Sequence, residues 1–341
     1  MPDTGKSVRL LLIGSLFIST VDADSAVAKP KEAAEITGLQ HILWAEPTDL
    51  AQRDLFYGSG GQQHAPVDTN FKFLSENRKG SSPKFEVKDS AGVTWKVKAG
   101  VEARPETAAS RLIWAVGYRT QEDYFLPEIH VSGLPQQLHW PPELIQPGGV
   151  VPNVRLERAH DGLVKIDSWS WKHSPVTGTR EWNGLRVLMA LINNWDLKDD
   201  NNGVFTNPND PRQRIYMITD LGASFGTNGI GRGHLESRGN LTSYQQSRFI
   251  TKVTSDRVSF ATPDRAPTRS MFIPPHYFYR LKLRWLGRNI PREDAKWMGQ
   301  LLARLSKKQI RDAFRAAGYE SGTAEAFAQV VESRIAALNT L

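Results

Sequence analysis

The chain has 341 residues, of which 40% are hydrophobic, and this suits one large domain or two lobes that share a core. It contains no cysteine, which excludes disulfides, zinc–thiolate sites and thiol catalysis. The net charge of +7 fits a nucleic acid, an anionic surface or a phosphorylated ligand as partner. Because Lys and Arg are spread along the chain without a dense block, no dedicated nucleic-acid binding is expected.

Residues 1–28 have the pattern of a secretory signal peptide. Lys6 and Arg9 form a basic region, and the apolar residues 10–20 are too few to span a bilayer comfortably. Residues 26–28, with the sequence AVA, offer small side chains at the two positions that a signal peptidase reads. An uncleaved anchor or a misjudged start codon is the alternative. We therefore expect an exported protein, periplasmic or extracellular, that is at most peripheral to a membrane.

A β-hairpin and a helix are expected next. Residues 84–89 and 93–100 alternate apolar and polar side chains on either side of the turn-forming residues 90–92, which predicts two paired strands. Residues 103–117 predict a helix, because a proline lies in the first turn and a glycine ends the segment. A further strand is expected over residues 124–131.

The segments that follow alternate between strand and helix patterns. After a connector rich in Pro and Gly over 132–153, residues 154–171 predict a second hairpin with its turn at Asp161-Gly162. Residues 180–195 predict a strongly apolar, buried helix. Residues 215–226 predict a strand that ends in Asp-Leu-Gly.

Helices are expected to dominate the end of the chain. Residues 227–272 are rich in Gly, Ser, Thr and Arg and predict a long irregular segment. Residues 305–319 predict a helix that opens with a capping box formed by Ser306 and Gln309.

The element order as a whole predicts an α+β fold of two lobes. The N-terminal lobe is expected over residues 29–131, with a small nucleotide-binding sheet and one helix. The mainly helical C-terminal lobe is expected over residues 132–341.

The strongest motif is the polar stretch DLKDDN, which follows the apolar helix. Asp196 is followed by Lys198 two positions later and by Asn201 five positions later. Such residues also favour helix ends and turns, so a solvated helix C-terminus is the plainer interpretation. We expect the intervening Asp199 and Asp200 to point to solvent.

Three other residues fit a phosphate and metal site at the expected places. Asp220 lies in TDLG, directly after an apolar strand. Lys98 lies at the end of the second hairpin strand, and Glu106 opens the next helix, where it can pair with that lysine. Lys96 is a rival to Lys98, because strand alternation puts both on one face.

A short turn before the first strand is a fourth element. Gly80, Ser81 and Ser82 can offer backbone N–H groups to a phosphate. Each of these patterns alone is weak, and their common order and spacing carry the interpretation.

Together these motifs resemble the protein-kinase-like superfamily, in particular its atypical HipA-like branch. The catalytic loop of that branch begins Asn-x-Asp, as Asn194-Trp195-Asp196 does here. Its phosphate loop has a Gly followed closely by a Lys, similar to Gly80 and Lys84. The export signal is also similar to secretory-pathway kinases and to spore-coat kinases of the CotH type.

The resemblance implies a set of roles in phosphoryl transfer from ATP. Asp196 would be the catalytic base and Lys198 would steady the transferring phosphoryl group. Asn201 and Asp220 would bind Mg²⁺ or Mn²⁺, and Lys98 would bind the nucleotide. The acceptor would be a hydroxyl group of a protein, sugar or lipid, and transfer of AMP in place of phosphate also stays open.

The chain departs from the family pattern in three ways. It has no G-x-G-x-x-G loop, Trp195 replaces the usual Arg, and Lys198 replaces the usual His of the HipA-like loop. Two alternatives therefore stay open: a catalytically inactive relative that binds a nucleotide or a partner, and a structural or adhesion protein of the cell envelope.

Export is tested by the position at which the mature chain begins. We expect N-terminal sequencing of protein from its native host to give a chain that starts near Lys29. A cytoplasmic protein that retains Met1 would contradict the predicted signal peptide.

Overall fold

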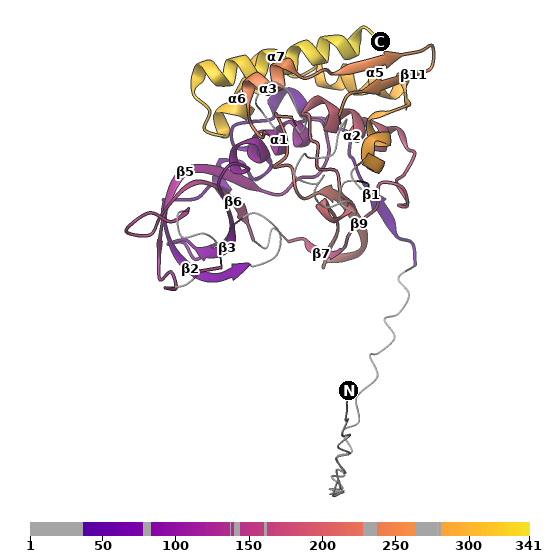
Figure 1. Ribbon diagram of the computed structural model, residues 1–341. Helices are drawn as coiled ribbons and strands as arrows, with labels where there is room; N and C mark the ends of the chain where they lie inside the picture. The colour runs from indigo at the N-terminus through magenta and orange to yellow at the C-terminus, as the bar shows by residue number, and fades with distance from the viewer. Residues whose placement is uncertain are drawn as a thin grey trace, which may run out of the picture. The chain divides into compact units, whose positions relative to one another are not determined.

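The computed structural model describes residues 37–77, 83–136, 138–139, 144–159, 162–227, 237–262, 278 and 281–341. The predicted signal peptide and the predicted phosphate turn of Gly80, Ser81 and Ser82 lie outside these residues. The strand and helix labels below are those of Figure 1.

The first large unit of the described chain is a closed barrel of five strands (Figure 1). Their order around the barrel is β2-β3-β4-β6-β5, and parallel pairing of β2 with β5 closes it. The strands are β2 (Asn70–Asn77), β3 (Lys84–Lys88), β4 (Thr94–Ala99), β5 (Asp123–Ser132) and β6 (Val150–Arg158). The predicted hairpin is confirmed as the antiparallel pair β3–β4.

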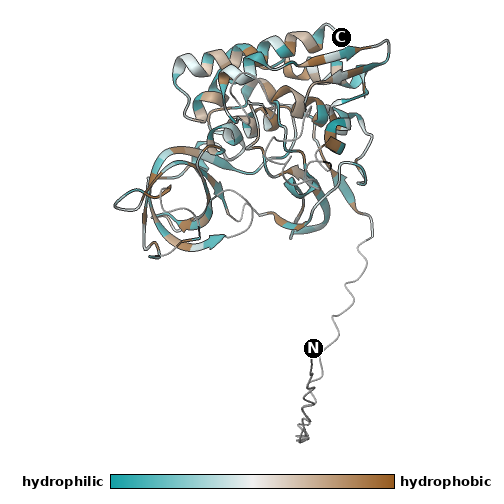
Figure 2. Ribbon diagram, in the orientation of Figure 1, coloured by the Kyte–Doolittle hydropathy of each residue, from teal (hydrophilic) through white to brown (hydrophobic). Residues whose placement is uncertain are grey.

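The barrel interior is apolar because alternate residues of each strand point inward. Val87, Trp95, Val97, Ile129 and Leu156 are buried in one cluster there. Apolar and polar residues are therefore interspersed along these strands (Figure 2).

Helix α1 (Ala103–Ala115) packs against β5 and β6 on the outside of the barrel and against α6 on its other side. It ends two residues before Gly117, which has a φ of 97°. A Cβ at this position would lie 2.2 Å from the carbonyl oxygen of Ala45, so only glycine fits.

The predicted hairpin over residues 154–171 is wrong. β6 pairs with β4 and β5, and β7 (Val164–Asp167) pairs with β8. Alternation indicates which residues face a core, but not which strand supplies the hydrogen bonds. The lobe boundary at residue 131 stays a prediction, and β6, which lies beyond it, belongs to the barrel.

A second sheet has the order β1-β9-β8-β7. It contains β1 (Gln40–Ile42), β8 (Asn202–Asn207) and β9 (Asp210–Ile218) besides β7. β8 and β9 form a hairpin, and β9 ends at Ile218, earlier than the predicted strand over 215–226. Asp220 therefore lies in the loop that leaves this sheet.

The remaining helices form the other part of the described chain (Figure 1). They are α2 (Arg180–Leu191), α3 (Leu241–Gln246), α5 (Arg292–Leu302), α6 (Lys307–Ala316) and α7 (Ser321–Asn339). α2 is buried and contacts α5, α7 and the short 3-10 helix η7 (Leu283–Gly287). Four more 3-10 helices are η1 (Leu50–Gln52), η2 (Gly58–Gly60), η3 (Gln62–His64) and η5 (Asp199–Asn201).

The segment 227–272 is more regular than its composition predicts. Its described residues contain α3 and the strands β10 (Ile250–Val253) and β11 (Arg257–Phe260). β11 also pairs with β12 (Ile290–Pro291), a long-range contact that no local pattern reveals.

The predicted α+β class is confirmed. A β-rich barrel with one packed helix is followed along the chain by a mainly helical part. Within the described residues, no helix combines the length and the apolar character that a membrane crossing needs.

The capping box of α6 allows a test of the fold. The Ser306 hydroxyl accepts a hydrogen bond from the N–H of Gln309 at 3.2 Å, and the Gln309 side chain accepts one from the N–H of Ser306 at 2.9 Å. Ser306→Ala should lower the free energy of unfolding by about 1 kcal/mol, measured by chemical denaturation. Ser306→Asp, which keeps an acceptor, should stay close to the parent, and equal stability of Ser306→Ala and the parent would contradict the cap.

Candidate functional site

A cleft of about 870 Å³ lies between the barrel and the segments that follow α2 and β9. Its walls come from β3, β4, β6, the first turn of α1 and the two loops that carry the sequence motifs. Six of the predicted site residues line it: Lys98, Glu106, Asp196, Lys198, Asn201 and Asp220.

Lys98 on β4 is the most constrained cation in this cleft. Its Nζ lies 2.7 Å from Glu106 Oε2, 2.8 Å from a carboxylate oxygen of Glu102 and 3.1 Å from Asp220 Oδ1. Burial alone lowers the pKa of Lys98, but the attraction of Glu106 and the other carboxylates outweighs it and raises the pKa above its usual value. Lys98 therefore stays charged in the buried site.

Lys96 lies two residues earlier on the same strand and has a different environment. Its Nζ pairs with Glu157 Oε1 at 2.9 Å, and 52% of its side chain is exposed, against 6% for Lys98. Both lysines line the cleft, but only Lys98 contacts Glu106 and Asp220. The Lys98–Glu106 pairing predicted from sequence is thus present, whereas the role of Lys98 in nucleotide binding stays a prediction.

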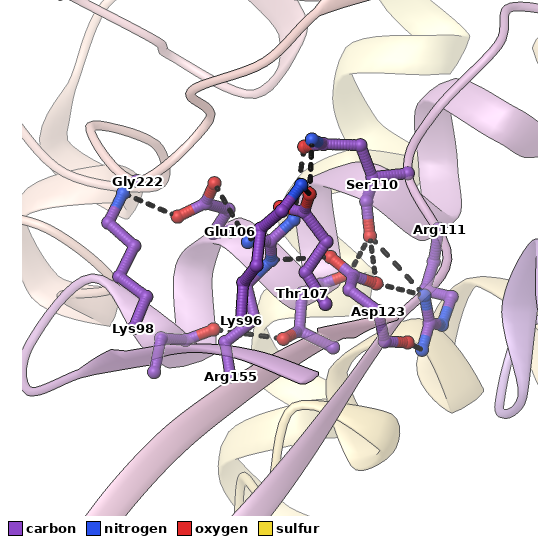
Figure 3. A network of polar contacts seen from close by, with 12 residues as sticks. Lys96, Lys98, Glu106, Thr107, Ser110, Arg111, Asp123, Arg155 and Gly222 are labelled. Atoms are coloured by element: carbon purple, nitrogen blue, oxygen red, sulfur yellow. Dashed lines mark hydrogen bonds and ion pairs between the residues drawn. The ribbon is translucent and has the colours of Figure 1, made fainter. Parts of the chain in front are cut away.

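A chain of alternating charges fixes Glu106 from behind (Figure 3). Arg155 of β6 lies 3.7 Å from Glu106 Oε1 and donates to Asp123 at 2.8 Å. Asp123 also binds Arg111 and accepts a hydrogen bond from the Ser110 hydroxyl at 2.9 Å. All of these groups are buried, and each charge has an opposite charge beside it.

The charge chain explains how a buried glutamate and arginine coexist. Burial raises the pKa of Glu106, and Arg155 and Lys98 oppose that effect. Burial likewise lowers the pKa of Arg155, but Glu106, Asp123 and Glu157 more than compensate and raise it. Removing one member would leave its neighbour as an uncompensated buried charge, which is strongly destabilising.

The turn after α2 sets the start of the Asp196 motif. Asn193 has a left-handed φ of 54°, which Asn tolerates better than most residues, and this ends the helix before the predicted residue 195. Its side-chain N–H₂ donates to the Gly226 carbonyl, and its side-chain oxygen accepts from the Thr262 hydroxyl. Asn194 then accepts a hydrogen bond from the N–H of Asp196 at 3.0 Å.

Asp196 and Asn201 belong to one locally closed loop. The Asn201 side-chain N–H₂ donates to the backbone carbonyl of Asp196 at 2.6 Å, which leaves the amide oxygen of Asn201 available. The Lys198 Nζ lies 3.3 Å from Asp196 Oδ2. The motif spacing of two and five positions therefore brings all three side chains into the same part of the cleft.

Backbone hydrogen bonds tie this loop to the Asp220 segment. The N–H of Thr219 donates to the carbonyl of Asn201 at 2.8 Å, and the N–H of Trp195 donates to that of Ala223 at 3.3 Å. The N–H of Phe225 donates to the carbonyl of Ile192 at 2.7 Å. The two motifs are thus joined on both sides of Asp220.

The Asp220 carboxylate lies where this junction meets Lys98. Its Oδ1 accepts hydrogen bonds from Lys98 at 3.1 Å and from the N–H of Gly222 at 3.2 Å. Burial acts to raise the pKa of Asp220, but Lys98 outweighs it and the pKa lies below its usual value. Asp220 is therefore ionised and able to bind a cation.

The donor atoms fit a hard divalent cation. Asp220 offers a carboxylate and Asn201 an amide oxygen, and both are ligands that Mg²⁺ and Mn²⁺ accept. The carboxylates of Glu102, Glu106 and Asp220 also lie within 4.8 Å of one another. The Lys98 ammonium contacts all three, so it is the cation of that second cluster.

Sequence reasoning missed Glu102 and Arg238. Glu102 precedes α1, contacts Lys98, and pairs with Arg238 at 3.1 Å. The Arg238 guanidinium lies over the Trp195 ring, 4.9 Å from the ring centroid. Glu102 could have been predicted, because it is an acidic residue one helical turn before Glu106. Arg238 lies in a segment without a motif.

Asp199 differs from the sequence prediction, whereas Asp200 agrees with it. Asp199 accepts a hydrogen bond from the N–H of Trp171 at 3.2 Å, so it does not simply point to solvent. Asp200 is exposed, as predicted, but it lines the cleft beside Asp196 and Lys198. Lys84, the first residue of β3, also lines the cleft, whereas Gly80 lies outside the described residues.

Comparisons with known proteins give structural neighbours only. No family model matches the chain, and no curated protein sequence does. The chain is similar to the crystal structure of the proinflammatory kinase CtkA of Helicobacter pylori, with 12% identity over 80% of this chain and 97% of that one and a TM-score of 0.43. It is also similar to the Golgi casein kinase, with 11% identity over 84% and 76% of the two chains and a TM-score of 0.30.

The two lysines of β4 provide a matched pair of variants. Lys98→Ala should weaken binding of ATP with Mg²⁺ at least about tenfold, a loss of about 1.4 kcal/mol, because it removes the buried charge that faces Asp220. Lys96→Ala removes the same charge from the same strand face and should change the affinity little. Calorimetry on both variants, with circular dichroism to verify folding, measures the difference. Sensitivity of Lys96 alone would contradict the assignment.

Proposed function

We propose that the protein is an exported, kinase-like phosphotransferase that moves a phosphoryl group from ATP to a hydroxyl acceptor. The observation that carries this proposal is the buried Lys98 ammonium, held between Glu106 and Asp220 in the cleft that also contains Asp196 and Asn201. Phosphoryl transfer depends mainly on positioning and charge neutralisation, and these residue types supply both.

The residues divide the work between nucleotide and acceptor. Lys98 attracts the phosphates, and the ion pair with Glu106 keeps the Lys98 ammonium in place. Asp196 orients the acceptor hydroxyl and takes up its proton, and Lys198 beside it faces the developing phosphate charge. Asn201 and Asp220 would hold Mg²⁺ or Mn²⁺, which supplies neutralisation of the phosphate oxygens when bound.

The Asn194-Trp195-Asp196 sequence supports the HipA-like branch of the superfamily over conventional kinases. Trp195 occupies the position at which conventional kinases have the arginine before the catalytic Asp. The Arg238 guanidinium lies over the Trp195 ring. Control through pairing of that arginine with a phosphorylated loop is therefore not part of the proposal. The expected export signal supports the similarity to exported kinases of the CotH type.

Isosteric variants of the two aspartates separate binding from turnover. Asp220→Asn should abolish metal-dependent ATP binding, because a chelating carboxylate supplies both charge and coordination. Asp196→Asn should retain binding but lower turnover by about two to four orders of magnitude, the usual range for a positioned base. Calorimetry with and without Mg²⁺ measures binding, and ATP consumption measures turnover.

Asp256→Asn is the control, since that side chain is 71% exposed and, among the described residues, pairs only with its neighbours on the β10–β11 turn. It should match the parent in both assays. Equal, mild effects at Asp196 and Asp220 would contradict the proposal and leave the polar motif as a solvated helix end. Binding of ATP by the parent without any turnover would instead identify a catalytically inactive, nucleotide-binding relative.

A further inference from the structure

A second cavity, of about 670 Å³, lies beside α2 and η7, away from the residues of the catalytic cleft. Seven of the described side chains line it, of which four are basic and none is acidic: Arg186, Lys282, Arg284, Arg288, Leu281, Trp285 and Asn289. Its volume is in the range of small-molecule sites. Figure 1 places α2, on which Arg186 lies, in the helical part of the chain.

Arg186 is a buried cation held by neutral acceptors. Its guanidinium donates to the backbone carbonyls of Leu286 at 2.9 Å, Trp285 at 3.2 Å and Arg288 at 2.8 Å, and to the Asn183 side chain at 2.7 Å. Only 6% of the residue is exposed. These bonds satisfy its donors and fix the η7 backbone, but they do not neutralise its charge.

The charges around Arg186 add to the positive potential. The pKa of Arg186 is lowered to about 10, chiefly by burial and also by Arg257, while Asp294 opposes both effects. Asp294 is engaged with the Asn183 side chain at 2.7 Å, and Asp256 pairs with Arg257 at 3.3 Å. Neither carboxylate lines the cavity.

Lys282 and Arg288 complete the basic wall from the solvent side. Both are exposed, and among the described residues neither forms an ion pair with a carboxylate. Like charges gathered in one cavity repel each other, and an anion bound between them removes that repulsion. Arginine in particular matches the oxygens of phosphate with paired N–H donors.

We propose that this cavity binds a small polyanion that carries two or more phosphate groups. Arg186 supplies a fixed positive field at its base, and Lys282 and Arg288 close on the phosphate oxygens from its rim. The same chemistry occurs in a free phosphorylated metabolite and in a phosphorylated lipid headgroup, so the experiment separates the two. The site is independent of the proposed kinase activity, because no residue is shared between the two cavities.

The test uses inorganic tripolyphosphate as the probe and the whole mature chain as the protein. Lys98→Ala is expected to remove binding of the probe in the catalytic cleft and to retain the binding at the cavity beside η7. Lys282→Glu with Arg288→Glu should weaken binding at least about tenfold, and Lys282→Gln with Arg288→Gln should weaken it less, in proportion to the charge removed. Calorimetry at two salt concentrations measures each affinity.

The control is Lys72→Glu with Lys88→Glu on the barrel, which changes the net charge by the same amount. These two exposed lysines face each other across β2 and β3, far from η7 in sequence. An equal loss in this control, complete loss of probe binding in Lys98→Ala, or no binding by the parent would overturn the proposal. A second arm uses vesicles of phosphatidylcholine with phosphatidic acid. The protein should bind these vesicles less tightly than it binds tripolyphosphate, so soluble tripolyphosphate should displace it from them. Vesicle binding that tripolyphosphate does not displace would assign a lipid headgroup as the source.

Discussion

The buried ammonium of Lys98 is the interaction on which the candidate site depends. It lies on β4 of the barrel, and its contacts to Glu106 at 2.7 Å and Asp220 at 3.1 Å join the barrel, α1 and the loop after β9. A buried cation without such partners would lose its charge or destabilise the fold. Arg155 and Asp123 continue this pairing of buried charges through the barrel wall. The β-rich part and the helical part are therefore coupled at one charged junction.

A second constraint is the backbone junction between the two motifs. Hydrogen bonds from Thr219 to Asn201 and from Trp195 to Ala223 hold the Asp196 loop against the Asp220 segment. The left-handed turn at Asn193 directs the chain out of α2 toward that junction. The side chains that would meet metal and acceptor thus stand on fixed backbone, which is what catalysis by positioning needs.

Local patterns in the sequence were enough to predict the β3–β4 hairpin, α1, the α6 capping box and the Lys98–Glu106 pairing. Each of these depends on residues close together in the chain. The partner of β6, the extra strand β2 and the pairing of β11 with β12 depend on long-range contacts that alternation does not specify. Arg238 was not predictable for the same reason, because only folding brings it to Glu102.

The most direct test of the account is a crystal structure of the protein with a non-hydrolysable ATP analogue and Mn²⁺. The account predicts that the Lys98 ammonium contacts a phosphate oxygen while it keeps its contact with Glu106, and that the anomalous signal of Mn²⁺ lies between Asp220 and Asn201. An analogue bound outside the cleft would contradict it. So would an analogue bound in the cleft without Mn²⁺ and with the Lys98–Asp220 contact unchanged.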